Sequence, residues 1–164
     1  MLFRSEARLA IEPAAAGLAA ARRGEDDLQA LRTQLARQRE AETVSDSFEA
    51  NRAFHLAIVS AARNLHLLRV AQSVWGGREG VRAYELMRPA VAERDLAEHG
   101  ELLAAIARGE SEGAERLARE HVVARSDAQH DERQVERRRP ARERDRREPI
   151  DVLGEVAQIG RAHV

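Results

Sequence analysis

Three histidines lie on the apolar faces of three separate predicted helices, and this placement constrains the fold more than any other feature of the chain. His55, His99 and His121 each occupy a position that a 3.6-residue periodicity otherwise fills with Leu, Ile, Val or Ala. A buried neutral imidazole is costly unless its ring nitrogens find polar partners. Three rings directed into one small core therefore predict a shared partner, and one bound metal ion would satisfy all of them.

The composition favours an all-α fold. Ala, Leu, Arg and Glu dominate the 164 residues, and aromatic residues make up only 3%. Most of these side chains lose little conformational freedom in a helix. Because few segments are rich in β-branched residues, a sheet is not expected. We predict one domain built as an antiparallel bundle of about six or seven helices.

Capping residues and helix breakers divide the chain into the predicted helices. After an opening segment near residues 3–11, Pro13 is expected at the first position of a second helix that Gly24 ends. Later helices are expected to begin near Asp26 or Asp27, Ser45 or Asp46, Leu65, Asp95 and Ser111. The stretch 78–87 is expected to be helical but is poorly delimited.

We divide the chain into a ligand-binding bundle over residues 1–126 and a charged tail over 127–164. The tail interleaves Arg with acidic residues, so it either prolongs the last helix into solvent or is disordered. Its last six residues, 159–164, match one reading frame of a common sequencing adapter, and we leave them out of the fold prediction.

Charge and residue usage limit the partners. The formal net charge of −1 offers no general attraction to a polyanion. The chain has no Cys, which excludes disulfides and thiolate metal ligands. No apolar run approaches the roughly 20 residues that span a bilayer, and no signal peptide is recognisable. We therefore predict a cytoplasmic protein without membrane association.

Asn51 is the fourth candidate ligand. It lies four residues before His55, so the two share a helix face. The short turn at 109–111 makes the helices that carry His99 and His121 antiparallel neighbours. Three imidazoles and one amide oxygen leave coordination positions open for water or a ligand oxygen, and they suit zinc, nickel, iron or copper. The alternative for each histidine is an ordinary half-buried ring.

Several motifs occur in a specific order: EARLAIEP at 6–13, NRAFH at 51–55, AARN at 61–64, EH at 98–99 and LLAAIARG at 102–109. Together with Ala114 and His121 they resemble the FadR C-terminal (FCD) domain, the effector-binding module of FadR-type GntR transcriptional regulators. The resemblance covers about residues 4–126.

The resemblance implies a usually dimeric helical bundle that holds a divalent metal, with zinc or nickel first, through one Asp and three His. Carried over, the ligands are Asn51, His55, His99 and His121, and an Asn in place of the more usual Asp should weaken metal affinity. The implied effector is a small organic acid or sugar acid. An Arg would bind its carboxylate, and the candidates are Arg8, Arg78 and Arg82.

The family also places a winged helix-turn-helix domain before this module, and Met1 falls just before the opening motif. We therefore expect a homodimeric, non-enzymatic sensor that contacts DNA only through a missing N-terminal domain. Effector binding would act by population shift. The alternatives are a metal-dependent hydrolase or lyase that activates water, and a structural helical module whose histidines are core residues.

Overall fold

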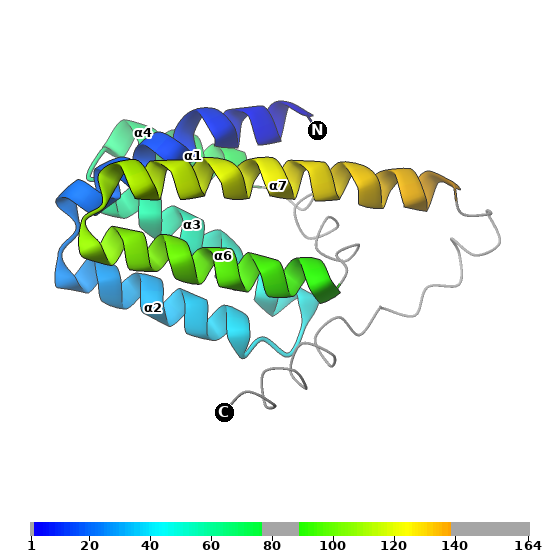
Figure 1. Ribbon diagram of the computed structural model, residues 1–164, viewed down its shortest axis with the longest axis horizontal. Coiled ribbons are helices and arrows are strands. Elements are labelled where there is room, and N and C mark those ends of the chain that lie inside the picture. Colours follow the sequence, from blue (N-terminus) through cyan, green and yellow to red (C-terminus); the bar gives the residue numbers. More distant parts are fainter. Residues whose placement is uncertain (1, 77–88, 139–164) are drawn as a thin grey trace.

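The computed structural model describes residues 2–76 and 89–138, which form six α-helices and no strand. The helices are α1 (Leu2–Arg22), α2 (Glu25–Arg39), α3 (Val44–Ala61), α4 (Leu65–Trp75), α6 (Pro89–Arg108) and α7 (Ser111–Arg138). They lie side by side as a bundle, and the C-terminal end of α7 extends beyond the other helices (Figure 1). The predicted all-α fold is confirmed, while the helix expected at 78–87 lies outside the described residues.

Helix α1 is central because it packs against α3, α4, α6 and α7. Its buried face is made of small side chains, which allow the neighbouring backbones to approach closely; they are Ala15, Ala16, Ala19 and Ala20. Larger side chains from the other helices fill the main core; the most deeply buried are Leu31, Phe54, Leu102 and Ile106. This packing sets the helices around the three histidines.

The prediction that Pro13 begins a helix is wrong, because Pro13 lies inside a continuous α1. Proline removes one backbone N–H and crowds the carbonyl four residues earlier, so an interior position is locally unfavourable. Here the ring is fully buried in the bundle, and the adjacent Glu12 is buried and hydrogen bonded. Tertiary contacts therefore outweigh the local preference.

Three helix starts also differ from the predictions. Gly24 caps α2 by donating its N–H to the Asp27 carboxylate at 2.8 Å. Thr43 caps α3, since its Oγ1 accepts the N–H of Asp46 at 3.1 Å. Asp95 does not cap a helix but lies inside α6, because its side chain is buried and pairs with Arg125. These differences move helix ends without changing which faces are buried.

The turn between α6 and α7 depends on a left-handed residue. Gly109 has a φ of +78°, and the N–H of Glu110 closes the end of α6 by donating to the carbonyl of Ala105 at 3.0 Å. A Cβ at Gly109 would also lie 3.1 Å from the guanidinium of Arg23. The turn makes α6 and α7 adjacent, which brings His99 close to His121.

We expect Gly109→Ala to lower the free energy of unfolding by about 1–2 kcal/mol, the usual cost of left-handed backbone for a residue with a Cβ. Urea unfolding followed by circular dichroism measures the change. Gly100→Ala is the matched control, because Gly100 lies inside α6 with no atom near its added Cβ. That variant should gain up to about 1 kcal/mol. Equal effects of the two substitutions would contradict this account of the turn.

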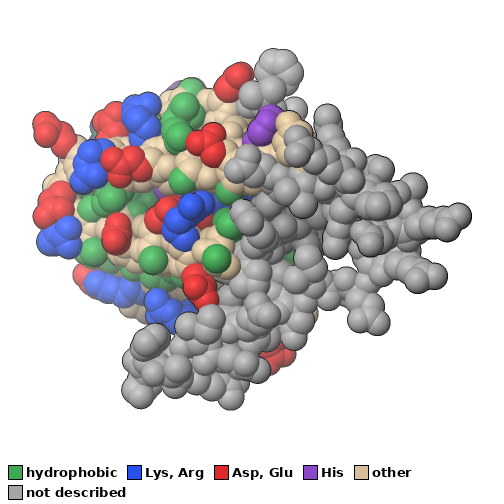
Figure 2. Space-filling view, turned by 45° about the vertical axis from the view of Figure 1, so that its right-hand side comes forward, with side chains coloured by type: hydrophobic (Ala, Val, Ile, Leu, Met, Phe, Trp, Pro, Cys, Tyr) green, Lys and Arg blue, Asp and Glu red, His purple; other side chains and the backbone are tan. Residues whose placement is uncertain are grey.

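The described surface carries both signs of charge. Acidic and basic side chains are interspersed on the face shown in Figure 2, and several form exposed pairs such as Arg116–Glu120 on α7. None of the described helices is long and apolar enough to cross a membrane.

Candidate metal centre

The structure brings the three predicted histidines together inside the bundle. His55 comes from α3, His99 from α6 and His121 from α7, and each is at most 3% exposed. Their ring centroids lie 4.7–5.2 Å apart, and each ring offers a nitrogen within 4.8 Å of the others. The Nε2 atoms of His99 and His121 are 3.3 Å apart.

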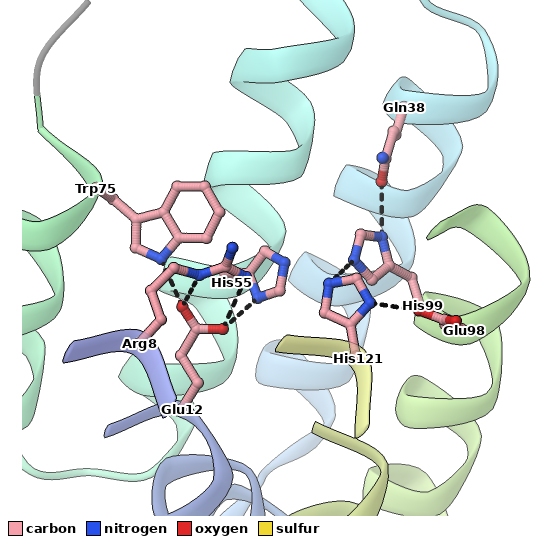
Figure 3. A network of polar contacts seen from close by, with 8 residues as sticks. All are labelled: Arg8, Glu12, Gln38, His55, Trp75, Glu98, His99 and His121. Carbon is pink, nitrogen blue, oxygen red and sulfur yellow. Dashed lines mark hydrogen bonds and ion pairs between the residues drawn. The ribbon is translucent and has the colours of Figure 1, made fainter. Parts of the chain in front are cut away.

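Each imidazole is held through Nδ1 by an oxygen from a different part of the chain (Figure 3). The pairs are His55–Glu12 at 3.0 Å, His99–Gln38 at 2.9 Å and His121–Glu98 at 2.7 Å. An ionised carboxylate only accepts hydrogen bonds, so beside Glu12 and Glu98 the Nδ1 atoms of His55 and His121 carry the proton and these neutral rings keep their lone pair on Nε2. His99 has the same arrangement when the Gln38 oxygen, and not its NH₂ group, faces the ring. Oxygen partners of this kind orient the histidine ligands of metal ions in proteins.

With Nδ1 protonated in all three rings, no group among the described residues donates a proton to the three Nε2 lone pairs. Those of His99 and His121 face each other across 3.3 Å. The Nε2 of His55 is buried and has no hydrogen-bond partner in the described part of the chain. Two ligand nitrogens at about 2.0–2.1 Å from a tetrahedral zinc ion lie about 3.3–3.4 Å apart. The donor set and its spacing therefore fit a divalent metal ion.

Burial keeps the rings neutral, which a metal ligand requires. It lowers the pKa of His55, and it lowers the pKa values of His99 and His121 well below their ordinary value, with the neighbouring imidazoles adding to the effect. Beside the rings, a cavity lined by Glu12, His55, His121 and aliphatic side chains leaves about 10 Å³ for the centre of a water-sized particle. This is room for one small particle.

Glu12 links the centre to two neighbouring side chains. Besides His55, it accepts hydrogen bonds from Arg8 Nε at 2.7 Å and Trp75 Nε1 at 2.9 Å. The Arg8 guanidinium lies 4.3 Å from the centre of the Trp75 ring, which stacks on His55. Burial raises the pKa of Glu12, but Arg8 and His55 outweigh it and hold that pKa well below its usual range. Glu12 therefore keeps its negative charge inside the bundle.

A second buried polar pair lies next to the histidines. Arg125 Nε is 3.3 Å from Asp95 Oδ2, and both side chains are at most 3% exposed. Asp95 Oδ1 has no hydrogen-bond partner among the described residues. Burial raises the pKa of Asp95 to about 6, although Arg125 acts in the opposite direction. Asp95 and Glu98 each offer an oxygen within 4.8 Å of a His121 nitrogen, so this pair adjoins the imidazole cluster.

Comparison with known proteins shows the family. The family model described as the FCD domain matches residues 5–124, which is most of the chain. The chain belongs to the FCD domain family. Among solved structures, E. coli McbR/YncC is similar with a TM-score of 0.66 and 23% sequence identity, covering 80% of this chain and 62% of that chain. The fold is therefore shared, and this chain spans less than two thirds of that protein. No curated protein is significantly similar in sequence.

The structure of the FCD domain brings some of the predicted site residues together but not all of them. His55, His99 and His121 converge, whereas Asn51 is buried one helical turn before His55 and its role as a ligand stays a prediction. Arg8 lies at the edge of the cluster, paired with Glu12. The other two effector-binding candidates, Arg78 and Arg82, lie outside the described residues.

Sequence reasoning missed the three residues that hold the imidazoles of the FCD domain. Glu12 and Glu98 lie in the motifs that carry the family resemblance, and neither is among the predicted site residues. Gln38 carried the clearest signal, because it continues the stripe of Leu28, Leu31 and Leu35 on α2 and is buried with them. A polar residue on an apolar stripe indicates a buried polar partner.

Proposed function

We propose that this FCD domain binds a divalent metal ion, zinc or nickel, through the Nε2 atoms of His55, His99 and His121. The observation that carries the proposal is the common orientation of the three buried rings. All three direct Nδ1 to an oxygen, so their lone pairs gather at one place. A divalent ion bound there with open coordination positions supplies an attachment point for a carboxylate oxygen.

We further propose that the effector is a small organic acid or sugar acid. Imidazole ligands are neutral, and the amide of Asn51 adds no charge if it also binds. Among the described residues, the carboxylates that contact the rings are those of Glu12 and Glu98, and Arg8 offsets part of their negative charge. An anionic effector supplies the remaining charge. The Arg8 guanidinium, which already binds the Glu12 carboxylate in two places, has the chemistry to recognise it.

In the intact protein this domain would act as the sensor of a cytoplasmic GntR-type transcription regulator, not as an enzyme. Family membership supports the regulator, and it makes a homodimer the expected assembly. Effector binding would shift the population of bundle conformations and thereby re-orient DNA-binding domains that are separate from this bundle.

Isothermal titration calorimetry on chelator-treated protein tests the proposal. Zn²⁺ and Ni²⁺ are titrated first, followed by lactate and gluconate as a hydroxy acid and a sugar acid. We expect one metal site per chain and carboxylate binding only to the metal-loaded protein, with both lost in His99→Ala. Folded protein that binds neither metal nor acid would refute the proposal and favour a purely structural bundle.

Asn51→Asp tests the fourth ligand. If residue 51 binds the cation, an added negative charge should tighten zinc binding about tenfold or more, which corresponds to about 1.4 kcal/mol. Competition with a chelator of known affinity measures the change. Asn64→Asp is the control, because Asn64 caps α4 and Asp caps helices equally well. Unchanged zinc affinity in Asn51→Asp would remove residue 51 from the ligand set.

A further inference from the structure

Four buried or half-buried side chains form a continuous chain of polar contacts through the centre (Figure 3). Gln38 Oε1 is 2.9 Å from His99 Nδ1, the two Nε2 atoms are 3.3 Å apart, and His121 Nδ1 is 2.7 Å from Glu98 Oε2. An ionised carboxylate can only accept a hydrogen bond, so Glu98 in this form keeps the proton of His121 on Nδ1. The Nε2 of His121 can then only accept a hydrogen bond or bind a cation.

The ring of His99 can face the Nε2 atom of His121 in either of its two neutral tautomers. With its proton on Nδ1, directed to Gln38 Oε1, its Nε2 lone pair faces the lone pair of His121, and a cation is needed between them. With its proton on Nε2, it donates to His121, and its Nδ1 lone pair then faces Gln38. In this second arrangement Gln38 must offer a donor in place of an acceptor.

A primary amide can meet both demands. Its oxygen and its NH₂ group have nearly the same shape and opposite hydrogen-bonding character, so a half-turn of the terminal bond exchanges them. The side chain of Gln38 is buried, which makes an unsatisfied partner costly. The carboxylates that hold His55 and His121 offer only acceptors.

We propose that Gln38 is a positioning residue that reverses its side-chain amide when a cation enters the histidine cluster. In the metal-free protein, the Gln38 NH₂ group donates to His99 Nδ1, and His99 Nε2–H donates to His121. With the cation bound, the His99 proton has moved from Nε2 to Nδ1, the Gln38 oxygen accepts it, and no proton is released. The inference rests on the proposed metal binding and adds a device that satisfies both states.

Nuclear magnetic resonance of the ¹⁵N-labelled full chain tests the reversal. Long-range nitrogen–proton correlations of the histidine rings show which nitrogen carries the proton, with chelator present and then with Zn²⁺ alone. We expect His99 to change from the Nε2–H form to the Nδ1–H form, while His121 stays Nδ1–H throughout. The amide protons of Gln38 should be hydrogen bonded to the ring only in the metal-free sample.

The outcomes separate this inference from the proposed function. Zinc binding with His99 in the Nδ1–H form in both samples would overturn the role of Gln38 and leave the metal site standing. A folded protein that binds no zinc would overturn both.

Gln38→Leu provides a second readout. Removing the partner of a metal-binding histidine typically weakens metal affinity by about tenfold to hundredfold, and we expect a loss of zinc affinity in that range. Gln29→Leu, at an exposed position of α2, is the matched control and should bind zinc like the parent. Circular dichroism shows whether each variant is folded. Parental zinc affinity in folded Gln38→Leu would overturn the inference.

Discussion

Arg125→Met is expected to lower the free energy of unfolding by about 3–5 kcal/mol, because it leaves the carboxylate of Asp95 buried without its cation. Methionine fills a similar volume, so most of the loss reflects the uncompensated charge. The loss should be smaller at pH 5 than at pH 8. Burial raises the pKa of Asp95 to about 6, and the protonated acid needs no cation. Urea unfolding at the two pH values measures both effects.

Two further variants isolate the cause. Asp95→Leu combined with Arg125→Met removes both charges and should recover most of the lost stability. Arg119→Met is the control on the same helix, where an exposed pair with Glu115 should be worth no more than about 1 kcal/mol. If Arg125→Met and Arg119→Met lower the free energy of unfolding by the same small amount, the buried pair is worth no more than an exposed pair.

Lowering the pH should destabilise the metal-free protein at pH values well above those at which protonation of carboxylates usually destabilises proteins. The pKa values of His55, His99 and His121 are lowered by burial, so the unfolded chain binds more protons at these rings below about pH 6.5. Asp95 and Glu98 act in the opposite direction, because burial raises their pKa values. Glu12 adds to the histidines, because its pKa is held low in the folded protein. These groups outnumber Asp95 and Glu98, so we expect stability to fall as the pH is lowered from 6 to 4.

Unfolding in urea at several pH values, with chelator present, measures this slope. His99→Gln removes one of the rings that take up a proton on unfolding, so its slope should be smaller, by at most the roughly 1.4 kcal/mol per pH unit that one proton contributes. Equal slopes in the parent protein and in His99→Gln would show that burial does not hold the His99 ring neutral.

The sequence was sufficient to predict the all-α class and the burial of the three histidines, because both follow from helical periodicity. The interruption expected at Pro13 was wrong, since a local rule cannot anticipate a ring packed inside a core. Periodicity also shows which face of a helix is buried but not which residue of another helix lies opposite.

For the same reason, the residues that hold the imidazoles could not be predicted from the sequence alone. Glu12 meets His55 from the first helix, and Gln38 meets His99 from the second. Glu98 precedes His99 in the sequence, yet it contacts His121 on α7. The buried pair of Asp95 and Arg125 was missed because Asp95 fits the start of a helix and its partner lies on another helix.

The imidazoles and their supporting oxygens come from five helices, α1, α2, α3, α6 and α7. No short stretch of the polypeptide holds two of the three rings, so an isolated peptide would have no chelating geometry to offer. Binding free energy at such a centre is available only to the assembled bundle and acts on the folding equilibrium as a whole. Under the proposed metal binding, opening any one of these helices would therefore release the ion together with the fold.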